Sequence, residues 1–272
     1  MKNVLSAVAA SLALSFGAHA GVVIDNFTVT QTGATPNTPG SFVQDSTTAG
    51  GGFWSQVSGA TTDIFGGYRD IYVNRTGGVG VGASKTVTAE VAGGTYSFSA
   101  ASEVAGAGII RWDGATAGSG DAVGDGSYGI NKSGVAATDI AAAAFGFKIT
   151  VTFADLDFPF TLQAFSGNDW TEVTIKSTGT GVFFVPFLAF FGPDVAYDNI
   201  GGFGRTTHGA GVSFGAVTAL QAIINPGGST EAVDLTIDLA ETTDVPEPGS
   251  LALMGLALLG IGAARRQLRT RN

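Results

Sequence analysis

Short segments in which apolar and polar residues alternate constrain the fold of this chain most strongly. In the range 232–239, polar residues separate apolar ones at every second position, which places on one face Val233, Leu235, Ile237 and Leu239. Successive side chains of a β-strand point to opposite faces of the sheet. The pattern therefore predicts a strand of an antiparallel sheet with one buried and one solvated face.

Further segments have strand-like patterns and are separated by glycine-rich turns. The strand candidates are residues 22–30, 85–91, 94–99, 147–153, 160–165, 170–176 and 181–191, and the turns include residues 77–78, 93–94 and 225–228. Residues 138–144 suggest a helix, whereas residues 217–223 fit a helix or a strand equally well. We predict an all-β fold, an antiparallel two-sheet sandwich of the jelly-roll type, formed by one domain over residues 21–240.

Composition limits the chemistry available to this domain. The chain contains no cysteine, so neither disulfides nor thiolate metal ligands contribute. The net charge of −9 becomes −13 once Lys2, Glu247 and the four C-terminal arginines are set aside. Such an acidic body argues against a nucleic-acid partner and is compatible with a cation-rich exterior or a neutral glycan.

The N-terminal residues 1–20 have the features of a secretory signal peptide. Lys2 precedes an apolar stretch over residues 4–16, and Ala18 and Ala20 form an A-x-A site that predicts cleavage before Gly21. A permanent membrane helix is the alternative, but the apolar run is short for a membrane span.

The C-terminal residues combine a proline-containing motif, an apolar run and a basic end. A linker over residues 241–244 is expected before the motif, which consists of Val245, Pro246, Glu247 and Pro248. The apolar run Leu251–Ala264 spans only ~21 Å as a helix, short of the ~30 Å hydrocarbon core, and Gly249 and Ser250 can extend it. We predict a transmembrane helix over residues 249–264, held by a basic tail over residues 265–272 that contains Arg265, Arg266, Arg269 and Arg271. A helix packed on the domain is the alternative, but the run lacks a polar face.

These C-terminal features resemble the PEP-CTERM sorting domain of exported bacterial proteins, which has also been labelled an ice-binding protein C-terminal domain. That second label describes the tail alone. The resemblance implies a Gram-negative producer of extracellular polysaccharide and an exosortase that cuts near residues 246–248. It also implies transient membrane anchoring before release to the cell surface or the extracellular matrix.

A second resemblance lies in the body of the chain. Residues 24–27, 66–70, 111–114 and 233–239 are similar to sandwich domains that precede such sorting tails, and also to jelly-roll carbohydrate-binding modules. Because a fold hosts many functions, this likeness implies only that glycan binding is compatible with the architecture.

Aromatic side chains are the candidate glycan contacts. Flat apolar faces with polar edges suit stacking on sugars, and the candidates are Trp54, Tyr68, Trp112 and Trp170. The alternative is that the three tryptophans belong to the core of the sandwich. Their position in the fold decides between the two interpretations.

Acidic loops are the candidate calcium sites, because calcium prefers oxygen ligands. One loop contains Asp121 and Asp125, and another contains Asp155 and Asp157. Neither has the spacing of an EF-hand, so an ordinary acidic surface is the alternative. No other cofactor is expected.

No catalytic residues are assigned. We expect a non-enzymatic protein with a structural or adhesive role and with polysaccharide as a partner. One alternative is a secreted glycan hydrolase, because a carboxylate pair for such chemistry cannot be located from sequence. The other is a purely structural matrix protein without a glycan ligand.

Overall fold

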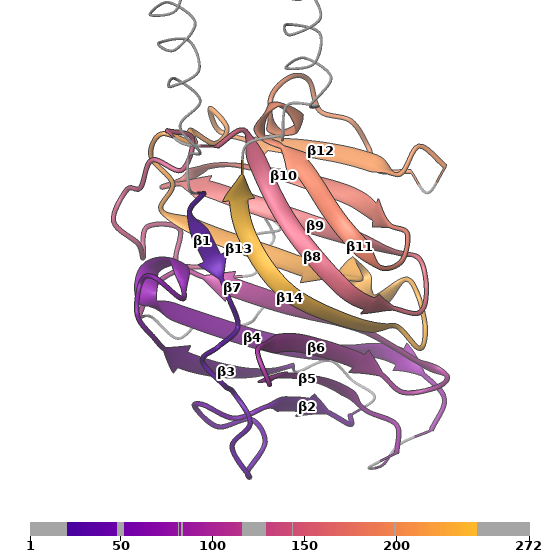
Figure 1. The fold of residues 1–272 in the computed structure, drawn as a ribbon. Coiled ribbons are helices and arrows are strands. Elements are labelled where there is room, and N and C mark those ends of the chain that lie inside the picture. Colours follow the sequence, from indigo (N-terminus) through magenta and orange to yellow (C-terminus); the bar gives the residue numbers. More distant parts are fainter. Residues whose placement is uncertain are drawn as a thin grey trace, which may run out of the picture.

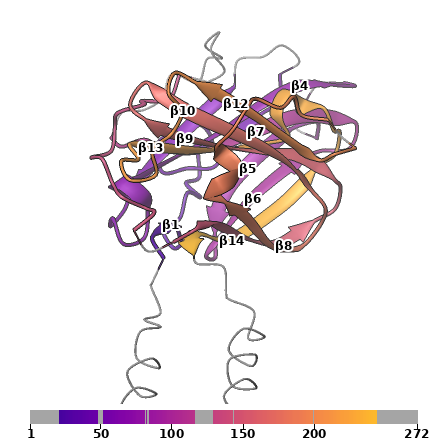
Figure 2. The same cartoon turned by 90° about the horizontal axis from the view of Figure 1, so that it is seen from above.

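A computed structural model describes residues 21–47, 52–80, 82, 84–115, 129–142, 144–198 and 200–243. These residues form an all-β fold of two antiparallel sheets (Figures 1 and 2). The strands are β1 (Val23–Asp25), β2 (Val43–Asp45), β3 (Phe53–Ser58), β4 (Tyr68–Gly78), β5 (Val87–Ala92), β6 (Thr95–Ala100), β7 (Val104–Trp112), β8 (Gly146–Ala154), β9 (Phe158–Ser166), β10 (Asp169–Ser177), β11 (Gly181–Pro186), β12 (Phe203–His208), β13 (Ala219–Ile224) and β14 (Asp234–Thr243). Short 3-10 helices occur at η1 (Phe65–Gly67), η2 (Phe187–Phe190) and η3 (Pro226–Gly228).

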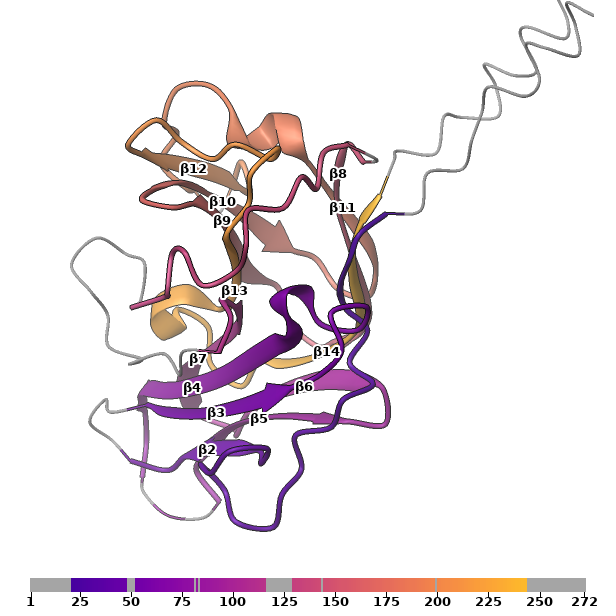
Figure 3. The same ribbon diagram turned by 90° about the vertical axis from the view of Figure 1, so that its left-hand side faces the viewer.

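The chain passes repeatedly between the two sheets. The first sheet has the strand order β11-β8-β14-β6-β5-β2, and β1 pairs with β14. The second sheet has the order β12-β10-β9-β13-β7-β4-β3. Figure 3 shows the two layers edge-on. The all-β, two-sheet prediction is therefore confirmed.

One hydrophobic core lies between the sheets. It joins Phe147 and Ile149 of β8, in the first sheet, with Phe160 of β9 and Trp112 of β7, in the second. In β8 the alternation is clear, because Phe147 and Ile149 are buried while Lys148 between them is half-buried. Burial of apolar surface is the main favourable term in folding, and here both inner faces supply it.

Strand β14 departs from the predicted alternation at a β-bulge. Leu235 and Ile237 are buried, but Leu239 is only half-buried. Ile237 pairs with Val151 and Leu239 pairs with the adjacent Thr150, so Asp238 is the extra residue of the bulge. One extra residue reverses the parity of the strand beyond it, so the inward positions after the bulge belong to Ala240 and Thr242.

Of the two segments with helical patterns, residues 217–223 contribute to strand β13. This strand lies between β7 and β9 and is buried along its whole length, so its residues lack the alternation of a half-solvated strand. The helix predicted over residues 138–144 is wrong for the described part of that segment. Thr138 instead forms an isolated bridge with Val217.

The predicted linker over residues 241–244 is also corrected, because Glu241, Thr242 and Thr243 belong to β14. Glu241 pairs with Lys148 and forms an ion pair with it, with 2.7 Å between Nζ and Oε1. Backbone and side-chain hydrogen bonds of 2.8 Å join Thr242 to Val22. The first and last described residues therefore lie side by side at one end of the domain (Figure 3).

Several sequence predictions fall on residues outside this description. They are the signal peptide with Ala18 and Ala20, the motif at residues 245–248, the membrane segment at residues 249–264, the basic tail at residues 265–272, and the loop with Asp121 and Asp125. In the part of the chain that is described, no helix is long and apolar enough to cross a membrane.

Candidate functional site

Three of the short segments singled out from the sequence meet in a buried polar cluster. Asp25 and Arg69 are both fully buried, and their side chains pair with 2.9 Å between Oδ1 and Nη1. The indole nitrogen of Trp112 donates to Asp25 Oδ2 at 2.9 Å, and the backbone nitrogen of Phe27 donates to Asp25 Oδ1 at 2.8 Å. Arg69, Trp112 and Phe27 thus all donate to the carboxylate of Asp25, which would be costly to bury without such partners.

The same cluster fastens the N-terminal segment to the second sheet. Arg69 Nε donates to Gln31 Oε1 at 2.7 Å, and its Nη2 donates to the carbonyl of Val29. Burial lowers the pKa of Arg69, and the charge of Asp25 opposes this shift. Because all of its partners are internal, the cluster has a structural role.

A row of polar side chains crosses the outer face of the second sheet. Cross-strand pairing aligns one residue from every strand of this sheet, in the order Gln56, Asp70, Arg111, Gln221, Gln163, Glu172 and Thr206. We call this set the polar row. Neighbouring strands lie ~4.8 Å apart, so the polar row extends over ~29 Å.

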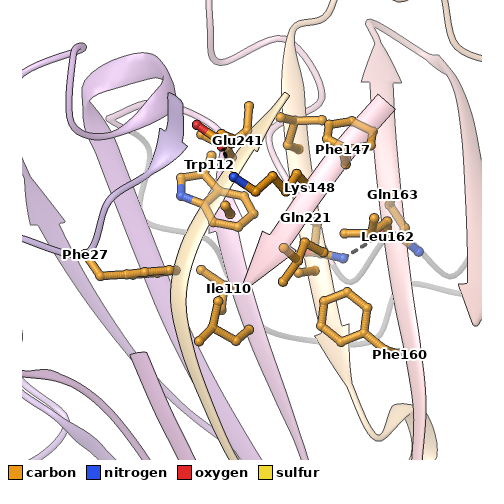
Figure 4. A pocket seen from close by; sticks show the side chains of 16 residues that line it. Phe27, Ile110, Trp112, Phe147, Lys148, Phe160, Leu162, Gln163, Gln221 and Glu241 are labelled. Carbon is orange, nitrogen blue, oxygen red and sulfur yellow. Dashed lines mark hydrogen bonds and ion pairs between the residues drawn. The ribbon is translucent and has the colours of Figure 1, made fainter. Parts of the chain in front are cut away.

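Hydrogen bonds connect the middle of the polar row. Arg111 Nε donates to Gln221 Oε1 at 2.8 Å, Gln221 Nε2 donates to Gln163 Oε1 at 2.7 Å, and Gln163 Nε2 donates to Glu172 Oε2 at 2.9 Å. The Gln221–Gln163 bond is visible in Figure 4. The guanidinium carbon of Arg111 also lies 4.2 Å from the ring centroid of Trp54. These contacts tie four strands together in one register.

Two buried carboxyl groups lie beside Arg111. Burial, together with the charge of nearby Asp113, raises the pKa of Asp70 to about 8, whereas Arg111 opposes the shift. Burial also raises the pKa of Asp113, again against the effect of Arg111. A hydrogen bond joins the two carboxyl side chains, so the pair holds a proton at neutral pH.

The polar row does not present an open surface at its centre. Asp70, Arg111, Gln163 and Gln221 are each at most 2% exposed. Gln56, Glu172 and Thr206, toward the two edges, are half-buried. The arrangement therefore serves first to hold the strands of the second sheet in register.

Two voids inside the domain are too small to be ligand sites. The void between the sheets, lined in part by Phe27, Ile110 and Phe160, holds only about 30 Å³ (Figure 4). A second void, lined in part by Val151 and Phe158, holds about 10 Å³. Ligand pockets are typically ~300–1,000 Å³, so neither void admits more than a few atoms.

A groove on the outer face of the first sheet is much larger, at about 250 Å³. Its floor consists of two cross-strand pairs between β5 and β6, namely Thr88 with Ser99 and Glu90 with Ser97. Phe42, which directly precedes β2, also lines it. We call this site the hydroxyl groove.

The polar positions on either side of the Gly93-Gly94 turn build this floor. Thr88 and Glu90 alternate with buried residues in β5, and Ser97 and Ser99 do the same in β6. The hairpin therefore places both polar sets on one face. Gln44 of β2 pairs with Thr88 and Thr236 of β14 pairs with Ser97, which continues the polar surface on both sides.

The predicted aromatic contacts do not line this groove. Trp112 and Trp170 are 3% and 1% exposed, so they do not form a stacking platform at the surface. Trp170 lies between Phe165 and His208, with centroid distances of 5.1 and 3.7 Å. Trp54 and Tyr68 are half-buried on the opposite sheet. Alternation at 85–91 and 94–99 could have indicated the groove, whereas no sequence pattern identified Phe42.

The described calcium candidates are engaged in other contacts. Asp155 Oδ1 accepts the backbone N–H of Asp234 at 2.8 Å, and Asp157 pairs with Lys176 at 3.1 Å. Among the residues that the structure describes, no group of three or more His, Asp or Glu side chains could hold a metal ion. Both carboxylates thus have partners within the protein, and calcium binding by Asp155 and Asp157 stays a prediction.

Comparison with protein families gives a match outside the β-sheets. The family model of the PEP-CTERM protein-sorting motif matches residues 244–267. No curated protein matches the chain. The matched segment begins immediately after Thr243, the last residue of β14. The motif indicates an exported protein that is anchored in the membrane and then processed by an exosortase.

Proposed function

We propose that this exosortase-sorted, exported protein binds polysaccharide at the cell surface or in the extracellular matrix, in a structural or adhesive role without catalysis. The observation that carries the proposal is the hydroxyl groove. Of the three cavities described above, it alone approaches the size of a ligand site.

The chemistry of the groove suits a neutral sugar chain. The side-chain hydroxyls of Thr88, Ser97 and Ser99 both donate and accept hydrogen bonds, as sugar hydroxyls do. Phe42 supplies an apolar surface for the C–H face of a sugar ring. The acidic body of the protein disfavours a strongly anionic polysaccharide.

The groove is better suited to binding than to cleavage. Glycoside hydrolysis normally needs two carboxyl groups ~5–9.5 Å apart. Of the described residues that line the groove, only Glu90 carries a carboxylate. Asp70 and Asp113 belong to the opposite sheet and are hydrogen-bonded to each other. These observations favour binding over hydrolysis.

The proposal includes finer assignments. We assign the sandwich to the jelly-roll type, supported by the repeated passage of the chain between the two sheets. We also propose cleavage of a signal peptide before Gly21 and a transient helical anchor over residues 249–264, supported by their apolar sequences.

The test is co-sedimentation of the processed protein with exopolysaccharide from the producing cell. The double variant Thr88→Val/Ser99→Ala removes two groove hydroxyls with little change in side-chain volume, and we expect retention to fall at least fivefold. The matched control, Thr150→Val/Thr152→Val, changes hydroxyls on β8, outside the groove, and should bind as the wild type does.

Three other outcomes contradict parts of this proposal. Absence of saturable retention of the wild type favours a purely structural matrix protein. Equal loss in both double variants would place the contact elsewhere on the sheet. Release of reducing sugar ends by the wild type would instead establish a hydrolase.

A further inference from the structure

The apolar run of the sorting segment begins only a few residues after the last strand of the domain. Strand β14 is paired up to Thr243, whose cross-strand partner is Gly146 of β8. The apolar run begins at Leu251, eight residues later in the sequence. Eight residues span at most ~28 Å even when fully extended. While this run is in the bilayer, the end of the domain at Thr243 must therefore stay close to the lipid surface.

Large apolar side chains are exposed beside this exit point. Phe145 is 68% exposed, and its backbone nitrogen donates to the carbonyl of Thr243 at 3.1 Å. The backbone nitrogen of Phe187 in turn donates to the carbonyl of Phe145 at 2.7 Å. Leu188, the next residue, is 78% exposed, and Phe191, which directly follows η2, is 50% exposed. We call Phe145, Leu188 and Phe191 the exit patch.

The exit patch is held on a rigid support. Arg205, which is mostly buried, donates from Nη1 to the carbonyls of Ala189 and Phe191 at 3.0 and 2.7 Å. Phe187 packs against Phe147 and Phe214 in the interior. The turn that carries Leu188 is therefore fixed from behind by buried Phe187, while the side chains of Leu188 and Phe191 are exposed to solvent.

We propose that the exit patch lies against the outer surface of the lipid bilayer while the sorting segment is in the membrane. Aromatic and aliphatic side chains are favourable at the membrane–water interface. The short connection keeps the patch at high effective concentration next to the lipid, so even a weak contact forms. The contact orients the domain at the membrane and holds the processing motif, only a few residues past Thr243, near the bilayer.

The experiment uses the full chain reconstituted in phosphatidylcholine/phosphatidylglycerol vesicles. Because the chain contains no cysteine, Leu188→Cys provides a unique site for an environment-sensitive fluorophore. Leu156→Cys is the matched control, because Leu156 is 41% exposed and follows the opposite end of β8. The nine residues of β8 separate the two ends by ~27 Å.

We expect a blue-shifted emission and at least threefold stronger quenching by nitroxide-labelled lipids at position 188 than at position 156. A label at Phe145→Cys should behave like the label at position 188. Equal quenching at positions 188 and 156 would overturn the proposal. So would a shift that appears without vesicles and grows with protein concentration, because it would identify a second copy as the partner.

Protection of position 188 only after co-reconstitution with an exosortase, without quenching by lipid, would also overturn the proposal and identify the peptidase as the partner. This inference rests on the sorting motif and the exit geometry. Its failure is therefore independent of any result at the hydroxyl groove.

Discussion

Replacement of Asp70 by Asn tests the most unusual electrostatic feature of the fold. Asp70 is 2% exposed, and burial with the charge of Asp113 raises its pKa to about 8. Between pH 4 and pH 8 the folded chain therefore retains a proton that the unfolded chain releases. The contribution of protonated Asp70 to the free energy of unfolding is therefore fully present below the unfolded pKa of 3.8. It declines as the pH rises and is lost once the pH passes the folded pKa of about 8.

The size of this effect follows from the two pKa values. One pKa unit corresponds to ~1.4 kcal/mol, so the rise to about 8 sets an upper bound of ~6 kcal/mol. Because Arg111 and Asp113 take part in the same titration, we expect about half of this bound, ~3 kcal/mol. The Asp70→Asn side chain resembles the protonated acid and carries no charge at any pH.

The assay is urea unfolding of residues 21–243 at pH 5, 7 and 9. About three of the roughly four pKa units lie above pH 5, so the free energy of unfolding of Asp70→Asn, relative to the wild type, should increase by ~2 kcal/mol from pH 5 to pH 9. Asp238→Asn is the control, because Asp238 is exposed at the bulge of β14. A difference between Asp70→Asn and wild type that stays constant with pH would refute the reasoning.

Two further substitutions test packing in the core. Arg69→Met leaves the buried carboxylate of Asp25 without its cation, so the free energy of unfolding, measured in urea, should fall by ~3–5 kcal/mol. A loss below ~1 kcal/mol would contradict the structural role of the Asp25–Arg69 pair. A Cβ at Gly108 would lie 2.6 Å from the ring of Phe98, so Gly108→Ala should lower the thermal midpoint through ~1–3 kcal/mol of overpacking. The same substitution at Gly77, where the nearest atom is 3.7 Å away, should cost less, and equal costs would argue against a steric cause.

Alternating segments predicted most of the strands from β5 to β14, because strand periodicity is local. Alternation could not anticipate the bulge in β14, which depends on pairing with β8. It also missed β4 and β7, which carry buried Arg69, Asp70 and Arg111 at positions that read as solvated in a sequence. Their burial depends on partners far away in the chain, such as Asp25 and Gln221.

The candidate sites show the same division. Trp112 and Trp170 are of a residue type that can stack on sugars, but in the folded protein both side chains are packed in the interior. The hydroxyl groove required the turn at Gly93-Gly94 to bring Thr88 opposite Ser99. Such a site is a property of strand register, and no single segment contains it.

By itself, the sequence determined where the protein is sent and which class of fold it adopts. The sorting motif at residues 244–267 is a linear signal, and a two-residue period is a property of a single strand. Only the tertiary structure decided which polar residues are buried, which hydroxyls share a groove, and which apolar side chains flank Thr243. These features depend on contacts between residues distant in sequence, because register and packing are fixed only when the two sheets assemble.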